Sequence, residues 1–339
     1  MAIATSYNVT STKGAKENLE NVLKTVEPTE TPLYSTLSQS AAPKATLNEW
    51  LVDSLASPEI GGVIDGVDLT ISDAQNLIDT RARLGNRVQT LRDIFSVSRQ
   101  AEMVDVAPGG SLMASSRAKS LLQLKRSIET AIGSGNDQSA GTSSAGALMC
   151  GLGIWSDPTA TGNTFDTSLK QGFRAVSGSR VSLASLTESA FRGLLQAVYT
   201  AAGSKGTYNL FAGPAVMNKI TDYTRSTTAN GNFSFDQDVS GKTLVRSVLT
   251  YVSDYSTINI IPDLFLGRVN GSASGTDTVE GTVNTDRAYL IPGDDTVSLK
   301  FLEGITIQDL PDNGAGKRAF SETMLSLRVS NPRALGSII

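Results

Sequence analysis

The sequence predicts an α+β fold, and three segments support this prediction. One long amphipathic helix is expected over residues 111–134. A compact segment in which helices and strands alternate follows, over residues 186–266. The C-terminal part, residues 287–329, is rich in strand patterns. One long helix, a compact strand–helix segment and a strand-rich C-terminal part together indicate an α+β protein.

The long helix is the strongest local signal in the chain. Pro108 and two glycines precede it, and Gly133 and Gly135 follow it, so both ends carry helix-breaking residues. About 22 residues at 1.5 Å rise give a helix of roughly 33 Å. One face is apolar and the other polar: the apolar face holds Leu121, Leu124, Ile128 and Ile132, and the polar face holds Arg117, Lys119, Gln123, Arg126 and Glu129.

The segment after residue 185 predicts two helices with a strand between them. Ser185 and Glu188 fit a capping box for a helix through Ala202 that stops at Gly203. "YNLFAG" is a buried strand, and Pro214 begins the second helix, which runs to about Tyr223. Further strands are expected at Thr243–Ser253, Ile258–Leu266, Arg287–Ile291, Val297–Leu302, Ile305–Leu310 and Phe320–Val329.

The N-terminal part predicts an extended strap with apolar anchors. Residues 14–26 form an amphipathic helix, and the next stretch, residues 27–55, is broken by three prolines that favour extended geometry. Two short apolar clusters, Leu33–Tyr34 and Trp50–Val52, lie in this polar stretch. Residues 47–80 have weak strand periodicity, and residues 81–104 predict a strand or a pair of strands.

Composition limits the classes of function. The chain has 339 residues, 40% of them hydrophobic and 18% charged, which suits a folded protein with ample core. The net charge of −4 argues against nucleic-acid binding by bulk charge. We expect no membrane span, because no run of eighteen apolar residues occurs. The sole cysteine, Cys150, excludes an internal disulfide.

Residue types also argue against catalysis. The chain has no histidine, which removes Ser-His-Asp and Cys-His nucleophile pairs and His-ligated zinc. The best nucleotide-binding candidate, "DQDVSGKTLV", has Asp236 where a phosphate loop needs glycine, so a turn is favoured. "GLGIW", residues 151–155, lacks the third glycine of a dinucleotide fingerprint. A glycosidase-type carboxylate pair stays open, because such residues can be far apart in sequence. We expect no enzyme, no cofactor and no metal.

Four stretches in this order resemble the major capsid proteins of tailed bacteriophages, which have the Hong Kong 97 phage capsid fold. They are "EPTETPLYSTL" (27–37), "NEWLVDSL" (48–55), "LTESAFRGLLQAVYTAAG" with "LFAGPAVMNKI" (186–203 and 210–220), and "SETMLSLRVSNPRALGSI" (321–338). Each motif alone is weak, but their order covers nearly the full chain. The glycine- and serine-rich excursion at 268–284 is longer than the family pattern suggests.

The resemblance implies a domain organisation. The expected parts are an N-terminal arm (1–46), an extended loop with its return strands (47–104), a peripheral domain with the long spine helix (105–140), an axial domain (141–295), and C-terminal strands that return to the peripheral domain (296–339).

The resemblance also implies a function in assembly. The chain would form hexamers and pentamers of an icosahedral shell around double-stranded DNA, without sequence-specific contact. A portal would be a partner, with scaffolding or decoration proteins as optional ones. The protein would be part of the virion and would be made and assembled in the host bacterial cytoplasm. The alternative is a non-viral shell compartment of the same fold; the long helices argue against a fibre or adhesin.

Candidate contacts between subunits follow from the strap and the loop. Leu33, Tyr34 and Trp50 would anchor the strap on neighbouring copies, whereas the alternative places Trp50 in its own domain. The loop has an acidic limb (45–79) and a basic limb (81–99). These charges would meet neighbours or neutralise each other within one hairpin. The charged candidates are Asp65, Asp68, Asp73, Arg81, Arg83, Arg87 and Arg92.

Overall fold

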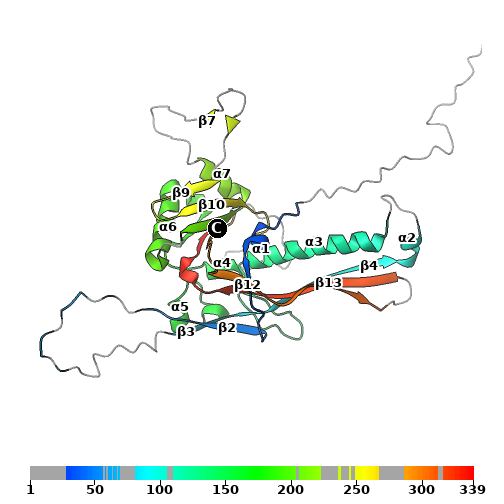
Figure 1. The fold of residues 1–339 in the computed structure, drawn as a ribbon, viewed down its shortest axis with the longest axis horizontal. Helices are drawn as coiled ribbons and strands as arrows, with labels where there is room; N and C mark the ends of the chain where they lie inside the picture. Colours follow the sequence, from blue (N-terminus) through cyan, green and yellow to red (C-terminus); the bar gives the residue numbers. More distant parts are fainter. Residues whose placement is uncertain are drawn as a thin grey trace, which may run out of the picture.

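A computed structural model describes most of the chain. The described residues are 28–55, 58, 60–62, 64–66, 68, 81–104, 110–203, 206–222, 236–237, 244–245, 249–266, 286–311 and 316–339. Their arrangement is an elongated body with two larger sheets (Figure 1). The predicted α+β class is confirmed.

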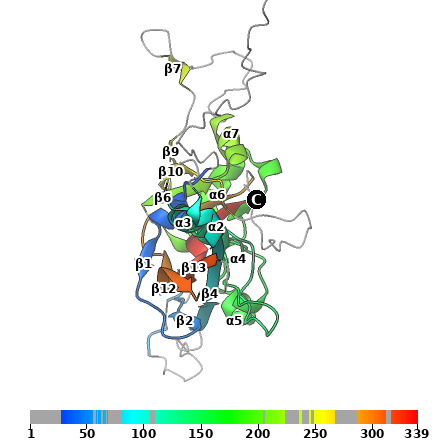
Figure 2. The same cartoon turned by 90° about the vertical axis from the view of Figure 1, so that its right-hand side faces the viewer.

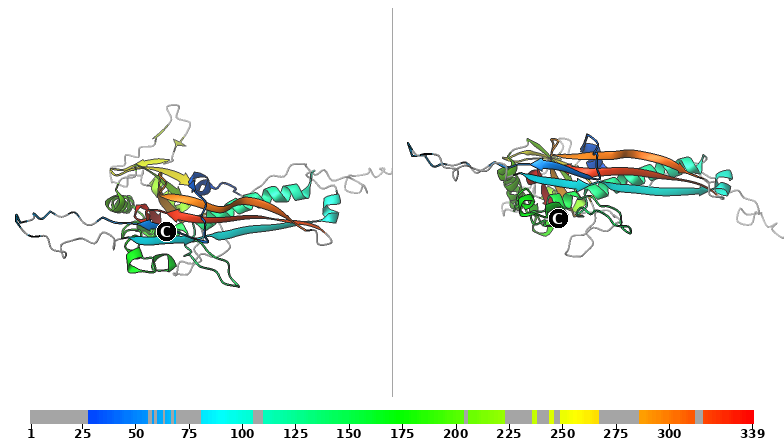
Figure 3. Two further views of the ribbon diagram at one scale, coloured as in Figure 1. Left: turned by 60° about the horizontal axis from the view of Figure 1, so that its bottom comes forward. Right: turned by 90° about the horizontal axis from the view of Figure 1, so that it is seen from below.

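The longer sheet has the strand order β1-β12-β13-β4. The strands β12 (Val297–Leu310), β13 (Gly316–Val329) and β4 (Gln89–Ser98) are antiparallel neighbours, and the short β1 (Ser38–Ser40) is parallel to β12. Figure 3 shows these long strands side by side. The two strands predicted at 297–302 and 305–310 are one strand, since β12 continues through irregularities near Phe301 and Glu303.

The predicted long helix is confirmed as α3, Leu112–Ile132, which lies along this sheet as a second layer (Figure 2). Ser111 caps its first turn by accepting a hydrogen bond from the amide of Ala114, and Gly133 follows its end. The predicted apolar residues Leu124, Ile128 and Ile132 are buried against the sheet. Helix α3 and the longer sheet therefore share one core.

The second sheet has the order β5-β14-β11-β6-β10-β9. Its centre is formed by β6 (Thr207–Ala212), which is parallel to β10 (Thr257–Pro262) and antiparallel to β11 (Ala288–Pro292). The predicted helices are α6 (Glu188–Ala202) and α7 (Pro214–Asp222). The α6 cap is Thr187 rather than Ser185, because the Thr187 hydroxyl accepts from the amide of Ala190.

The chain ends in this second sheet. Strand β14, Gly336–Ile338, lies between β5 (Arg180–Val181) and β11. Of residues 296–339, which the resemblance assigns to the peripheral domain, β12 and β13 lie in the longer sheet and β14 joins the sheet of β6. Gly336 packs closely in this sheet, since a Cβ there would lie 3.3 Å from the Cβ of its ladder partner Leu290.

Strands β2 (Leu47–Val52) and β3 (Ala82–Arg87) form an antiparallel pair at the base of the extended loop. The end of the predicted strand 81–104 is helical: α2, Arg99–Met103, forms because the Ser98 side chain accepts from the amide of Ala101. The predicted strand 243–253 is β9 (Thr250–Val252) in its last part. The remaining short elements are α1 (Pro32–Thr36), α4 (Leu152–Trp155), η3 (Asn163–Phe165), α5 (Ser168–Gln171), η4 (Leu183–Ser185), β7 (Asp236–Gln237), β8 (Leu244–Val245) and η5 (Pro332–Ala334).

Candidate assembly interface

The strap lies on its own subunit between residues 32 and 40. Leu33 is fully buried and Leu37 nearly so, both in the core that α3 shares with the longer sheet. Tyr34 is half-buried, and its ring packs edge-on against Phe301 at 6.4 Å between ring centroids. Strand β1 then pairs with β12. The side chain of Leu33 is therefore not exposed for a neighbour, whereas part of Tyr34 is.

A buried carboxyl group holds the strap. Glu129 of α3 accepts hydrogen bonds from the amides of Leu33 at 2.7 Å and Tyr34 at 2.6 Å. Burial, and then the nearby Asp263 carboxyl, raises the pKa of Glu129 to about 9. The expected position of Glu129 on the polar face of the helix is wrong, because its side chain is fully buried. The spacing of apolar residues along a helix does not reveal a carboxyl group that accepts hydrogen bonds from a segment distant in sequence.

Trp50 of β2 also packs within its own chain. Its ring lies 5.7 Å from that of the buried Trp155, which meets Phe165 edge-on at 5.5 Å. Trp50 stays half-buried, so one part of the ring remains open to a neighbour. This contact favours the alternative in which Trp50 belongs to its own domain.

Two arginines of the basic limb pair with the acidic limb. Arg81 Nε lies 3.1 Å from Asp53, and Arg83 Nη1 lies 3.6 Å from Glu49, all on exposed side chains. Such exposed pairs stabilise by only about 0–1 kcal/mol each. Within one subunit, the limbs thus partly neutralise each other.

The other charged candidates lie apart from these pairs. Arg92 of β4 binds Glu322 at 2.5 Å and lies over the ring of Phe320 at 4.9 Å, so it stabilises the longer sheet. Arg87 is half-buried at the end of β3, and Asp65 and Asp68 are exposed on the loop. Asp73 lies outside the described residues.

Four apolar side chains on the described part of the loop are exposed. Leu51 is 68% exposed, Leu55 94% and Ile64 76%, and Ile60 is fully exposed. Apolar side chains that gather on one exposed segment are typical of protein–protein contact sites. The loop is therefore better suited to contact a partner than to pack on its own subunit.

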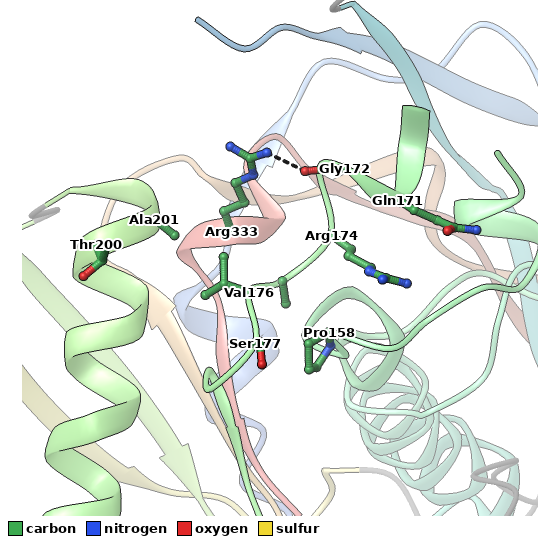
Figure 4. A pocket seen from close by; sticks show the side chains of 10 residues that line it. Pro158, Gln171, Gly172, Arg174, Val176, Ser177, Thr200, Ala201 and Arg333 are labelled. Atoms are coloured by element: carbon green, nitrogen blue, oxygen red, sulfur yellow. Dashed lines mark hydrogen bonds between the residues drawn. The ribbon is translucent and has the colours of Figure 1, made fainter. Parts of the chain in front are cut away.

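The cavity shown in Figure 4 has no carboxylate in its lining. This cavity, of about 480 Å³, lies beside α6, and its lining includes two arginines. Arg333 donates to the carbonyl of Gly172, and Arg174 to that of Ala160. Among the described residues, no three His, Cys, Asp or Glu side chains gather at a site for a metal ion. In the same part of the chain, no helix combines the length and apolarity that crossing a bilayer requires.

The rejected nucleotide motifs have no described site. The Gly-Lys-Thr sequence at 241–243 lies outside the described residues. Residues 152–155 of "GLGIW" form α4, whose side chains Leu152 and Trp155 are buried in the core. Core packing accounts for this segment.

The fold and these surfaces can be compared with known proteins. A family model described as SU10 major capsid protein matches residues 4–339. The chain belongs to the SU10 major capsid protein family. Members of this family form the shell of the virion from repeated copies of one subunit, so this chain is a major capsid protein. A search of curated proteins gave no significant match.

Solved structures agree on the fold of this SU10-type capsid protein. The cyanophage A-1(L) capsid matches with a TM-score of 0.67 at 13% identity, over 95% of this chain and 96% of that chain. The capsid of a native GTA particle matches with a TM-score of 0.59 at 10% identity, over 99% of both chains. The mature capsid of bacteriophage PhiM1 matches with a TM-score of 0.57 at 12% identity, over 95% of this chain and 91% of that chain. The predicted Hong Kong 97-type fold is confirmed.

The family match gives the exposed loop a context. The SU10 family match favours the viral shell over the non-viral compartment. In a shell of repeated subunits, apolar and charged side chains that are exposed on one copy can be covered by the next. The strap and the extended loop are therefore the candidate assembly segments of this capsid protein.

Proposed function

We propose that the chain forms the hexamers and pentamers of a closed icosahedral shell around the double-stranded DNA of a tailed bacteriophage. The main support is the family match over residues 4–339. The exposed apolar side chains of the loop, from Leu51 to Ile64, support the same proposal, because repeated contacts between copies would bury them. The protein acts through many weak contacts that add up over the shell, and not through catalysis.

The partners follow from charge and position in the virion. A strongly basic inner wall would bind packaged DNA tightly, and the net charge of −4 argues against such a wall. The contact with DNA would be without sequence specificity. A closed shell needs an opening for DNA, which a portal provides, and scaffolding or decoration proteins are optional further partners. Synthesis and assembly take place in the host bacterial cytoplasm.

The domain assignment stays part of this proposal. The second sheet with α6 and α7 would form the axial domain at the capsomer centre, and α3 with the longer sheet would form the peripheral domain. The strap and the extended loop would reach neighbouring copies through Tyr34, Trp50, Asp65, Asp68, Asp73, Arg81, Arg83 and Arg87.

Charge reversal tests whether the loop charges act between subunits. We expect Arg83→Glu to impair assembly strongly while the melting temperature of the monomer stays nearly unchanged, because the Arg83–Glu49 pair is exposed. Repetition around the shell would multiply the loss. Assembly is measured by light scattering and sedimentation, and the melting temperature by calorimetry.

A swapped pair is the control. The double variant Glu49→Arg/Arg83→Glu restores a pair within the hairpin but presents reversed charges to a neighbour. If the double variant assembles normally while Arg83→Glu does not, the pair serves only the loop's own fold. If both assemble poorly, and added salt weakens wild-type assembly in the same direction, the contact lies between subunits.

A further inference from the structure

Two buried carboxyl groups meet where three parts of the chain join. Glu129, near the end of α3, binds the strap through two amides. Asp263 follows β10 of the second sheet and is only 2% exposed. Its Oδ1 accepts from the amide of Phe265 at 2.9 Å, while its Oδ2 is buried and has no hydrogen-bond partner among the described residues. The strap, the spine helix and the second sheet therefore converge on one pair of carboxyls.

The pair needs a proton to be stable. Two adjacent carboxylates cannot both ionise in a buried site without strong repulsion. A proton on Glu129 removes this repulsion and donates to Asp263, which gives the buried Oδ2 its missing partner. We propose that Glu129 and Asp263 share one proton at neutral pH, and that this proton latches the strap and the segment after β10 onto α3.

The packing around the pair is tight. At the end of α3, a Cβ on Gly133 would lie 2.7 Å from the backbone of Leu266. Tyr289 of β11 donates its hydroxyl to the carbonyl of Gly133 at 2.8 Å, and Arg287 donates to the same carbonyl at 3.4 Å. Water has little access to this joint, so ionisation of Glu129 would require the joint or the strap to open.

Four other polar side chains lie around the joint. Arg287 faces the end of α3 from the second sheet, and Arg126 of α3 lies over the ring of Phe265 at 4.8 Å. Burial raises the pKa of the Tyr34 phenol above its ordinary value near 10, so it stays neutral. The Tyr289 hydroxyl donates a hydrogen bond to the carbonyl of Gly133. The pH dependence of the latch rests on the carboxyl pair.

The sign of the pH dependence follows from the direction of the shift. Burial raises the pKa of Glu129 to about 9, and burial also raises that of Asp263. An open strap exposes Glu129 to water, where it titrates near the ordinary value of 4.5. At a pH between these two pKa values, Glu129 takes up a proton when the strap closes. The latch is strongest in mild acid and weakens as the pH rises toward 9.

Hydrogen exchange of the full chain tests the latch. After correction for intrinsic rates, the protection of the Leu33 and Tyr34 amides should fall up to tenfold per pH unit between pH 6 and 8. In Glu129→Gln the neutral amide donates to Asp263 at every pH, so the slope should disappear. The amides of β6 serve as an internal control, and they should show no such slope.

A second variant decides the question if Glu129→Gln does not fold. In Asp263→Asn the neighbouring negative charge is gone, and the Asn amide donates a hydrogen bond to ionised Glu129. The decrease in amide protection should therefore end at a lower pH than in the wild type. Flat wild-type protection, the same slope in Glu129→Gln, or an unchanged end point in Asp263→Asn would overturn the latch. Because exchange is followed in unassembled chain, failure here leaves the proposed assembly function untouched.

Discussion

Removing residues 1–40 should destabilise the chain severely, and by far more than removing residues 1–28 does. The longer deletion takes away two buried leucines, Leu33 and Leu37, and strand β1. Each lost leucine side chain costs about 2–5 kcal/mol. The longer deletion also removes the two backbone amides, of Leu33 and Tyr34, that donate hydrogen bonds to Glu129. The total of about 4–10 kcal/mol is comparable to the whole stability of a typical domain.

This prediction replaces a simpler one. The expectation that Leu33 anchors the strap on a neighbouring copy does not fit its burial in the core of its own subunit. The measurement is chemical denaturation of both truncated chains against the full chain, followed by circular dichroism. The shorter deletion is the control, because Pro28 and the two residues after it are exposed and every strap contact from Pro32 onward remains. Equal stability of all three chains would contradict the anchoring of the strap.

Asn86→Asp should cost about 3–5 kcal/mol, the range for a buried charge that no opposite charge balances. Asn86 of β3 is fully buried. Its amide nitrogen donates to the carbonyls of Cys150 at 3.0 Å and Leu327 at 2.8 Å, and its oxygen accepts from the amide of Cys150 at 2.7 Å. An aspartate would lose both donated bonds and place a negative charge against two carbonyl oxygens. The base of the extended loop would lose its attachment to β13.

The residue opposite in the ladder provides the matched control. Asn48 of β2 pairs with Asn86 in register, but its oxygen accepts from Lys300 Nζ at 3.4 Å. Asn48→Asp gives this lysine a carboxylate partner, so we expect a change of about 0–1 kcal/mol, in the stabilising direction. Thermal unfolding of both variants measures the contrast. If the two substitutions have equal effects, Asn86 does not carry the attachment.

The regular elements could be predicted because their signals are local. Helices α3 and α6 have apolar stripes bounded by caps and glycines, and β6, β10 and β11 are short apolar runs with clear ends. Two predictions were wrong for local reasons as well: the division of β12 into two strands, and the strand expected over residues 99–103. An irregularity that keeps a strand continuous, and a serine that caps a new helix, resemble ordinary turn signals in sequence.

The contacts of the strap and loop residues were harder to predict because they depend on partners distant in sequence. Leu33 packs in a core that includes residues of α3 and β12. Glu129 accepts a hydrogen bond from the amide of Leu33, about a hundred positions earlier in the chain. Composition identified the opposite charges of the two loop limbs, but not that Arg81 and Arg83 lie beside Asp53 and Glu49. The strand register of β2 and β3 fixes those pairs, and sequence spacing across a long loop does not specify register.

Electron cryo-microscopy of the purified, assembled protein tests the central claim most directly. We expect closed shells with five-fold and six-fold capsomers, in which residues 186–265 lie nearest the capsomer axis and the helix of residues 111–134 is peripheral. The exposed side chains from Leu51 to Ile64 should be covered by a neighbouring copy. A protein that stays monomeric at every concentration, or shells in which this loop contacts no neighbour, would contradict the account.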